Sequence, residues 1–169
     1  MSMTNSKEEF KIGASMIHAP GLNVMYGDSK GNIAWWASAK LYKFLPHVKT
    51  KFVMDGASGK DDIIEYLDFS QNPMAENPPW NYVYSANNQP DSIARMIYPG
   101  YYLPEDRAKR IVSLLKAKNN WNKKSAKKMI NDVKSTVSVD IIKELINNIN
   151  FNSFNNQEQV AIEKLKLWD

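Results

Sequence analysis

Cysteine is absent from this chain of 169 residues, and it contains only two histidines, His18 and His47. Without thiols the chain forms no disulfide, offers no thiolate nucleophile and has no zinc-thiolate site. The histidines are far apart in the sequence, and neither has a second ligand at helical spacing, so we interpret both as core or surface side chains. The chain therefore offers few histidines from which a metal site or a Ser-His-Asp triad could form.

Long hydrophobic runs are also missing. No stretch approaches the roughly 18 apolar residues that cross a bilayer, and the N-terminus lacks the apolar core of a signal peptide. We therefore expect no membrane partner. Apolar residues make up 43% of the chain and aromatic residues 11%, which is enough to bury a core and argues against disorder.

Glycine and proline do not occur in residues 105–169, whereas residues 20–104 hold nearly all of them and most of the aromatic side chains. The later part has a helical rhythm of apolar residues. This split predicts an α+β fold, with a few antiparallel strands followed by a helical segment. We read residues 1–169 as a single partial domain in which residues 1–104 form a helix and a β-rich part, and residues 105–169 a helical part.

Capping and turn signals predict the individual elements. Ser6 and Glu9 have the spacing of a capping box, which begins a helix of about three turns ahead of Pro20. Two strands joined by a glycine-containing turn are expected within residues 22–37, and a third strand over 81–86. The pattern weakens over residues 38–80, where we expect a long loop. The back part predicts four helices: 104–118, one capped by Ser125, one over 141–149, and one that opens at 155–158 and runs to Trp168.

Three local patterns suggest function but have simpler explanations. Residues 55–61 read DGASGKD and resemble a phosphate-binding loop in composition. The glycines lie too close together for a Walker motif, so we interpret the segment as an ordinary turn. Asp61, Asp62 and Glu65 fit either a cation site or a solvated turn, and we favour the turn. Trp35 and Trp36 are neighbours on a strand, so one is expected in the core and the other against a missing neighbour or a ligand.

Residues 105–134 carry ten basic and only three acidic side chains. Clustered positive charge is typical of nucleic-acid binding, so a basic helical module is one alternative function. Lysines opposite an apolar stripe are more often the solvated face of a helix, and nucleic acid is not the partner we expect. The lysines concerned are Lys116, Lys118, Lys123, Lys124, Lys127 and Lys128.

Four motifs in a fixed order resemble those of the penicillin amidase (penicillin acylase) family of N-terminal nucleophile hydrolases. Residues 22–36, LNVMYGDSKGNIAWW, are similar to the family hairpin N-x-x-Y-A-D-x-x-G-N-I-G. Residues 55–69 look like a passage D-G-T-x-x-x-D-W-x-G-x-x-P-F, and residues 77–90, NPPWNYVYSANNQP, resemble N-P-x-x-G-Y-I-A-T-A-N-N-x-P. Residues 98–102 and 106–111, YPGYY and DRAKRI, are similar to the start of the family's Y-x-x-R-A-x-R-I helix.

The resemblance implies an enzyme that hydrolyses an amide through a serine at the N-terminus of its catalytic chain, whose own α-amino group is the base. Asn87 matches the asparagine whose side-chain amide donates to the oxyanion, together with a backbone N–H. Arg107 matches the arginine that orients this asparagine. Both residues also have simpler interpretations: Asn87 can be part of a turn, and Arg107 can be a charged residue in the first turn of a helix. The ordered motifs favour the catalytic roles.

The same resemblance implies what lies outside this chain. The nucleophilic serine is expected upstream of residue 1, and we read Ser2 as part of a start or cloning remnant. The partners implied are the remainder of the catalytic chain, a short partner chain and a small acyl amide, such as a penicillin or an N-acyl homoserine lactone. The family also implies a zymogen, a periplasmic or secreted location, a link to antibiotic biosynthesis or resistance, and a structural calcium in the full enzyme, with no cofactor held by this segment.

One motif departs from the family pattern. Residues 62–69 read DIIEYLDF and lack the tryptophan of the family passage, so we carry over no substrate or cation contact from this loop. A non-catalytic interaction domain on the acylase scaffold is the second alternative function. The isolated chain is expected to be inactive.

Overall fold

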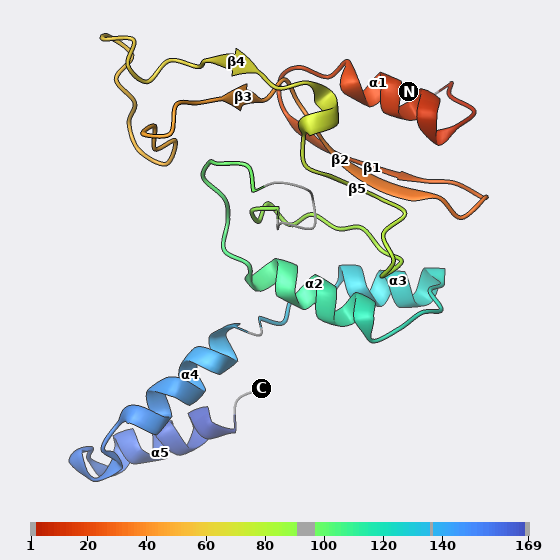
Figure 1. Cartoon of the computed structure of the whole chain (residues 1–169). Helices are drawn as coiled ribbons and strands as arrows, with labels where there is room; N and C mark the ends of the chain where they lie inside the picture. Colours follow the sequence, from red (N-terminus) through yellow and green to blue (C-terminus); the bar gives the residue numbers. More distant parts are fainter. Residues whose placement is uncertain (1–2, 91–96, 136, 168–169) are drawn as a thin grey trace. The chain divides into compact units, whose positions relative to one another are not determined.

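The computed structural model describes residues 3–90, 97–135 and 137–167 (Figure 1). The chain forms two compact units, Met1–Pro104 and Glu105–Asp169, which are described separately below. The first contains one helix and two small antiparallel sheets, and the described part of the second contains helices. The predicted α+β class is therefore confirmed.

The first unit begins with α1, Lys7–Ser15. Ser6 caps it, because its hydroxyl accepts a hydrogen bond from the N–H of Glu9 at 3.1 Å. The Glu9 carboxylate reaches back to the N–H of Asn5 at 2.8 Å, one residue before the position expected for a capping box. The helix start predicted from the sequence is thus confirmed.

Three strands form the main sheet in the order β1-β2-β5: β1, Leu22–Gly27; β2, Ile33–Ser38; and β5, Met74–Glu76. All pairs are antiparallel, and Trp36 on the central strand lies opposite Val24 of β1 and Met74 of β5. The predicted hairpin is confirmed. Its turn is held by Asp28, whose carboxylate accepts N–H bonds from Lys30 and Asn32, both at 2.9 Å. The side-chain amide of Asn32 and these backbone donors lower the pKa of Asp28 to about 2.

The core of this unit lies between α1 and the main sheet (Figure 1). Ala14 and Trp36 have no exposed surface, and Met74 is 2% exposed. The ring of Phe10 on α1 lies 6.1 Å from the ring of Trp36 and 5.0 Å from that of Tyr26. The apolar face of α1 is therefore covered by the aromatic side chains of the hairpin, and this gives the short helix the tertiary packing that it needs.

Two sequence predictions in this unit were wrong. Residues 81–86 form no strand, because no described segment pairs with them and Asn81 has a left-handed φ of 60°. The third strand is instead β5, inside the stretch expected to be a loop. It is anchored by the buried Asn72, whose amide donates to the carbonyls of Ala37 and Ala39 at 2.9 and 2.8 Å. Three residues are too few to display an alternating pattern.

The prediction for the tryptophan pair was also wrong in part. Trp36 lies in the core as expected, but Trp35 is only 6% exposed as well. The indole N–H of Trp35 donates to the side-chain oxygen of Asn23 at 2.9 Å, so its polar atom is satisfied within the hairpin. Trp35 therefore needs no missing neighbour.

Glu76, at the end of β5, joins the sheet to α1. Its carboxylate accepts from Lys11 at 2.6 Å and from the indole N–H of Trp36 at 3.0 Å, and it forms an ion pair with Lys7 at 3.1 Å. Burial by itself raises the pKa of Glu76, but the hydrogen bonds from Lys11, Trp36 and Lys7 outweigh it and bring the pKa down to about 2. The charged form of Glu76 therefore stabilises the packing of α1 on the sheet.

Glu76→Gln is expected to make the unfolding of this unit less dependent on acid pH. Because the pKa is lowered from 4.5, the stabilisation by Glu76 is complete above pH 4.5 and is lost as the pH falls toward 2. At pH 7 the variant should lose roughly 1–2 kcal/mol of unfolding free energy, and at pH 2 it should match the parent. Urea titrations at both pH values measure the difference.

Glu65→Gln is the matched control, because Glu65 pairs with Lys43 at 2.8 Å while both side chains are more than half exposed. Such surface pairs contribute little, so this variant should behave as the parent at both pH values. An equal loss for Glu76→Gln at pH 2 and pH 7 would contradict the electrostatic explanation.

A second sheet contains two short strands, β3, Tyr42–Lys43, and β4, Glu65–Tyr66. They pair antiparallel, with Tyr42 opposite Tyr66. A short 3-10 helix, η1, Phe69–Gln71, follows, and its cap is Asp68, which accepts from the N–H of Ser70 at 2.8 Å. The long stretch between the hairpin and β5 thus contains a two-stranded sheet of its own and a short 3-10 helix.

The second unit contains α2, Asp106–Lys116; α3, Lys123–Ile130; α4, Val137–Asn148; and α5, Asn156–Lys166, with a short 3-10 helix η3, Phe151–Ser153, between α4 and α5. The four predicted helices are present. Ser125 does not begin α3; Asn122 does, and Ser125 is the third helical residue, bonded to Asn122 in a capping box. Arg110 and Asp132 form a two-bond ion pair at 2.8 and 2.6 Å that ties α2 to the end of α3.

None of the helices in the described part of the chain has the length and hydrophobicity of a membrane-spanning helix.

Candidate functional site

Asn77 begins the segment that leads to Asn87 and anchors it to the main sheet. Its N–H donates to the carbonyl of Ile33, and its side-chain oxygen accepts from the N–H of Ile33, both at 2.9 Å. The side-chain amide of Asn77 also donates to Asn32 at 3.0 Å. The segment therefore starts from a fixed point beside the hairpin turn.

Asn87 lies in a bend of the chain between the buried Ala86 and the partly buried Asn88. Its φ is 61°, in the left-handed region that asparagine adopts more readily than most residues. The residue itself is exposed. The catalytic role of Asn87 stays a prediction.

The two adjacent asparagines have different surroundings. The side-chain oxygen of Asn88 accepts from the N–H of Ala86 at 3.2 Å, and its amide donates to the carbonyl of Gln89 at 3.1 Å. Asn88 therefore stabilises the bend from inside. Asn87 is the exposed member of the pair.

Residues 98–103 support the bend from the other side. The N–H of Leu103 donates to the carbonyl of Asn87 at 2.9 Å, and the side-chain amide of Gln89 donates to the carbonyl of Tyr98 at 3.0 Å. Burial raises the pKa of both Tyr98 and Tyr102, so both phenols stay protonated at neutral pH. The bend thus has two defined attachments outside its own sequence.

Arg107 is the second residue of α2 and belongs to the other unit. It is exposed, and the next residue, Ala108, is 4% exposed. The structure describes Asn87 and Arg107 each within its own unit. The pairing of these two residues stays a prediction.

The remaining candidates from the sequence take up local structural roles. The Nε2–H of His47 donates to the carbonyl of Lys60 at 3.0 Å, and the ring lies 3.4 Å from Asp61; His18 is exposed. The Ser58 hydroxyl donates to the carboxylate of Asp55 and lowers its pKa most, and the N–H groups of Ser58 and Ala57 also donate to it and lower the pKa further. This is the ordinary turn expected for residues 55–61. Ser2 and Trp168 lie outside the described residues.

The family resemblance places the structural calcium in the full enzyme and names no ligand for it in this chain. Among residues 3–90, 97–135 and 137–167, no three histidine, aspartate or glutamate side chains gather as a metal site would require. Glu65 pairs with Lys43, and Asp61 accepts from the N–H of Asp55 at 2.6 Å.

The six lysines singled out above in α2, α3 and the segment between them are exposed, as the solvated-face interpretation expects. The side chain of Lys118 lies over the ring of Trp121, 5.6 Å from its centre. Asp132, an acid of this stretch, is engaged by Arg110, which holds the pKa of Asp132 below its usual range.

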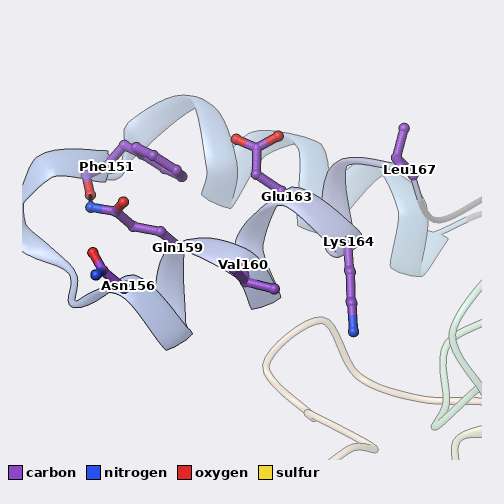
Figure 2. A pocket seen from close by; sticks show the side chains of 7 residues that line it. All are labelled: Phe151, Asn156, Gln159, Val160, Glu163, Lys164 and Leu167. Carbon is purple, nitrogen blue, oxygen red and sulfur yellow. Dashed lines mark hydrogen bonds between the residues drawn. The ribbon is translucent and has the colours of Figure 1, made fainter.

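An open groove runs along α5 in the second unit (Figure 2). Gln159 spans one end of it and donates to the carbonyls of Phe151 and Phe154 at 3.3 and 2.9 Å. The lining contains neither Asn87 nor Arg107 and holds no pair of groups suited to nucleophilic or acid-base chemistry. Its lining residues are Phe151, Asn156, Gln159, Val160, Glu163, Lys164 and Leu167.

A small antiparallel sheet covered by one helix and followed by a helical unit defines a segment of the penicillin acylase fold. Thermostable penicillin G acylase from Alcaligenes faecalis is similar over 98% of this chain, with a TM-score of 0.75 and 21% sequence identity. The family model of penicillin amidase matches residues 1–169. The chain belongs to the penicillin amidase family.

The chain spans 30% of the length of that acylase chain. At this sequence identity the likeness establishes the fold alone. The comparison with curated proteins found no match.

Sequence analysis did not identify the residues that support the bend at Asn87. Tyr42 and Tyr98 are 56 positions apart, and no short motif links them. The available signals were that Gln89 lies within residues 77–90, and Tyr98 and Tyr102 within the YPGYY stretch, both of which resemble family patterns.

Proposed function

We propose that this chain is part of the catalytic chain of an amide hydrolase that acts on acylated amines. The observation that supports this most directly is the match of the penicillin amidase family over residues 1–169, with Asn87 at an exposed left-handed bend in the segment 77–90. Penicillins and N-acyl homoserine lactones are substrates of the chemical class that we propose.

In this proposal the bond that breaks is the amide between an acyl group and an amine. The hydroxyl of a serine outside this chain attacks the carbonyl carbon, with the α-amino group of that serine as the base. The carbonyl oxygen becomes an oxyanion, to which the side-chain amide of Asn87 donates together with a backbone N–H. The amine leaves with the proton, and water then releases the acid from the serine ester.

Arg107 is proposed to hold the side-chain oxygen of Asn87 in the complete enzyme, so that the N–H end of the amide faces the substrate. An amide rotates unless a partner fixes it, and a guanidinium is a strong donor for its oxygen. The proposed partners are the remainder of the catalytic chain and a short partner chain. The proposed location is the periplasm or the outside of the cell, after processing of a precursor.

The experiment that tests this function uses the native gene product. An antibody raised against residues 3–90 isolates the chain from source cells, and its mass and N-terminal sequence are determined. We expect a chain several times longer than 169 residues that begins with serine and releases free acid from a panel of acyl amides. A product of about this length without hydrolytic activity would contradict the proposal and favour a non-catalytic interaction domain.

A further inference from the structure

The hydroxyl of Tyr98 forms two hydrogen bonds with the backbone of Tyr42, one as acceptor and one as donor. It accepts from the N–H of Tyr42 at 2.8 Å and donates to the carbonyl of the same residue at 3.0 Å. Tyr98 is half-buried, and its hydroxyl serves as both donor and acceptor to the backbone of Tyr42. A phenylalanine at this position would keep the ring and lose both bonds.

Tyr42 is available for this contact because of the strand pairing of β3. In an antiparallel pair, the N–H and C=O of one residue point to one side and those of its neighbours to the other. The carbonyls of Leu41 and Lys43 accept from Leu67 and Ile64 of the β4 side, at 2.9 and 2.8 Å. The N–H and C=O of Tyr42 therefore point to the opposite edge of β3, where the Tyr98 hydroxyl takes both.

The main chain of Tyr98 is attached to the bend that holds Asn87. Its carbonyl accepts from the side-chain amide of Gln89 and from the hydroxyl of Tyr102, both at 3.0 Å. Five residues further on, the N–H of Leu103 donates to the carbonyl of Asn87 itself at 2.9 Å. The segment 98–103 therefore connects the edge of β3 to the bend at two points.

We propose that Tyr98 is a positioning residue for amide hydrolysis, which holds segment 98–103 against β3 and thereby sets the left-handed bend at Asn87. This inference rests on the proposed function, in which Asn87 donates to the oxyanion. Tyr98 acts through Leu103 and Gln89 and has no role as an acid, base or nucleophile. A donor to an oxyanion must lie within a few tenths of an ångström of its best distance, so a looser bend lowers the rate of the chemical step more than it weakens substrate binding.

The test is Tyr98→Phe in the full-length enzyme, with an acyl amide that the enzyme hydrolyses as the probe. We expect kcat to fall about tenfold, because two hydrogen bonds to a distant support are lost, with KM changed less than about twofold. Tyr101→Phe is the matched control, since Tyr101 lies in the same stretch and is 81% exposed; it should keep the parent kcat. A parent kcat in Tyr98→Phe would overturn the inference.

A double variant separates positioning from a general structural role. If Tyr98 acts through Asn87, then Tyr98→Phe added to Asn87→Ala should cause no further loss of kcat. Losses that multiply would overturn the inference. If Asn87→Ala alone keeps full turnover, the proposed function of Asn87 fails; if Asn87→Ala is impaired and Tyr98→Phe is not, only the role of Tyr98 fails.

Two further measurements cover the possibility of a folding defect. Amide hydrogen exchange should be faster at Leu103 in Tyr98→Phe and unchanged at Trp36 in the core. If Tyr98→Phe does not fold, Gln89→Met tests the inference in its place. This substitution removes the hydrogen bond from the Gln89 side chain to the Tyr98 carbonyl, which also joins the bend to segment 98–103. A parent kcat in Gln89→Met would then overturn the inference, and a lower kcat with unchanged KM would support it.

Discussion

Asn87→Ala in the complete enzyme is expected to lower kcat by about a hundred- to thousandfold, with KM little changed. The reason is that alanine removes the amide that donates to the oxyanion. This charge develops only in the transition state, so substrate binding is less affected. Steady-state kinetics on one acyl amide, with the release of free acid as the readout, measure both constants.

Asn88→Ala is the informative companion to this variant. Asn88 has the same side chain one position later, but both ends of its amide bond the bend itself, to Ala86 and Gln89. We therefore expect a smaller loss of kcat than in Asn87→Ala. The reverse order would assign the donor to Asn88, and parent turnover in Asn87→Ala would remove Asn87 from the site.

Arg107→Ala should resemble Asn87→Ala with a weaker effect, because the amide stays in place and loses only its orientation. Lys109→Ala is the control for charge at this end of α2, since Lys109 pairs with Glu105 on the exposed surface at 3.5 Å. An equal effect of the two substitutions would mean that Arg107 contributes charge alone.

Trp36→Ala is expected to lower the free energy of unfolding of the first unit by about 3–5 kcal/mol. The side chain has no exposed surface, and it contacts α1 and both neighbouring strands of the main sheet. Alanine leaves a cavity and also removes the indole N–H of Trp36 that donates to the Glu76 carboxylate. Urea denaturation followed by far-UV circular dichroism measures the change.

Trp121→Ala provides the comparison, because Trp121 is 38% exposed and its indole N–H donates to the nearby carbonyl of Lys118 at 3.0 Å. Its loss should cost less than about 1 kcal/mol. A change below that value for Trp36→Ala would contradict the central place of Trp36 in the core.

The helices and the hairpin could be predicted from the sequence because their signals are local. Ser6 and Glu9 mark the start of α1 within a few residues, and the turn at residues 28–32 joins two strands that pair with each other. Asn122 was missed as the cap of α3 because Ser125, three residues later, is an equally good capping residue by type. Either choice predicts the same helix.

Strand β5 and the residues around Asn87 depend on contacts between distant parts of the chain. Residues 81–86 have the composition of a strand, but composition does not supply a partner, and a strand exists only where its backbone groups are paired. Met74–Glu76 has little β pattern and still forms a strand, because Asn72 fixes the chain against β2. Glu76 then becomes the partner of Lys7 and Lys11, about 65 residues away.

The sequence by itself determined the α+β class, the hairpin, the helices and the resemblance that drew attention to Asn87 and Arg107, because periodicity, caps, turns and ordered motifs are properties of neighbouring residues. Only the tertiary structure decided which of two adjacent asparagines is exposed and which residues hold the bend. Those outcomes depend on hydrogen bonds such as Tyr98 to Tyr42, between residues 56 positions apart. Such a bond forms only when the rest of the unit brings its two ends together, so no local pattern encodes it.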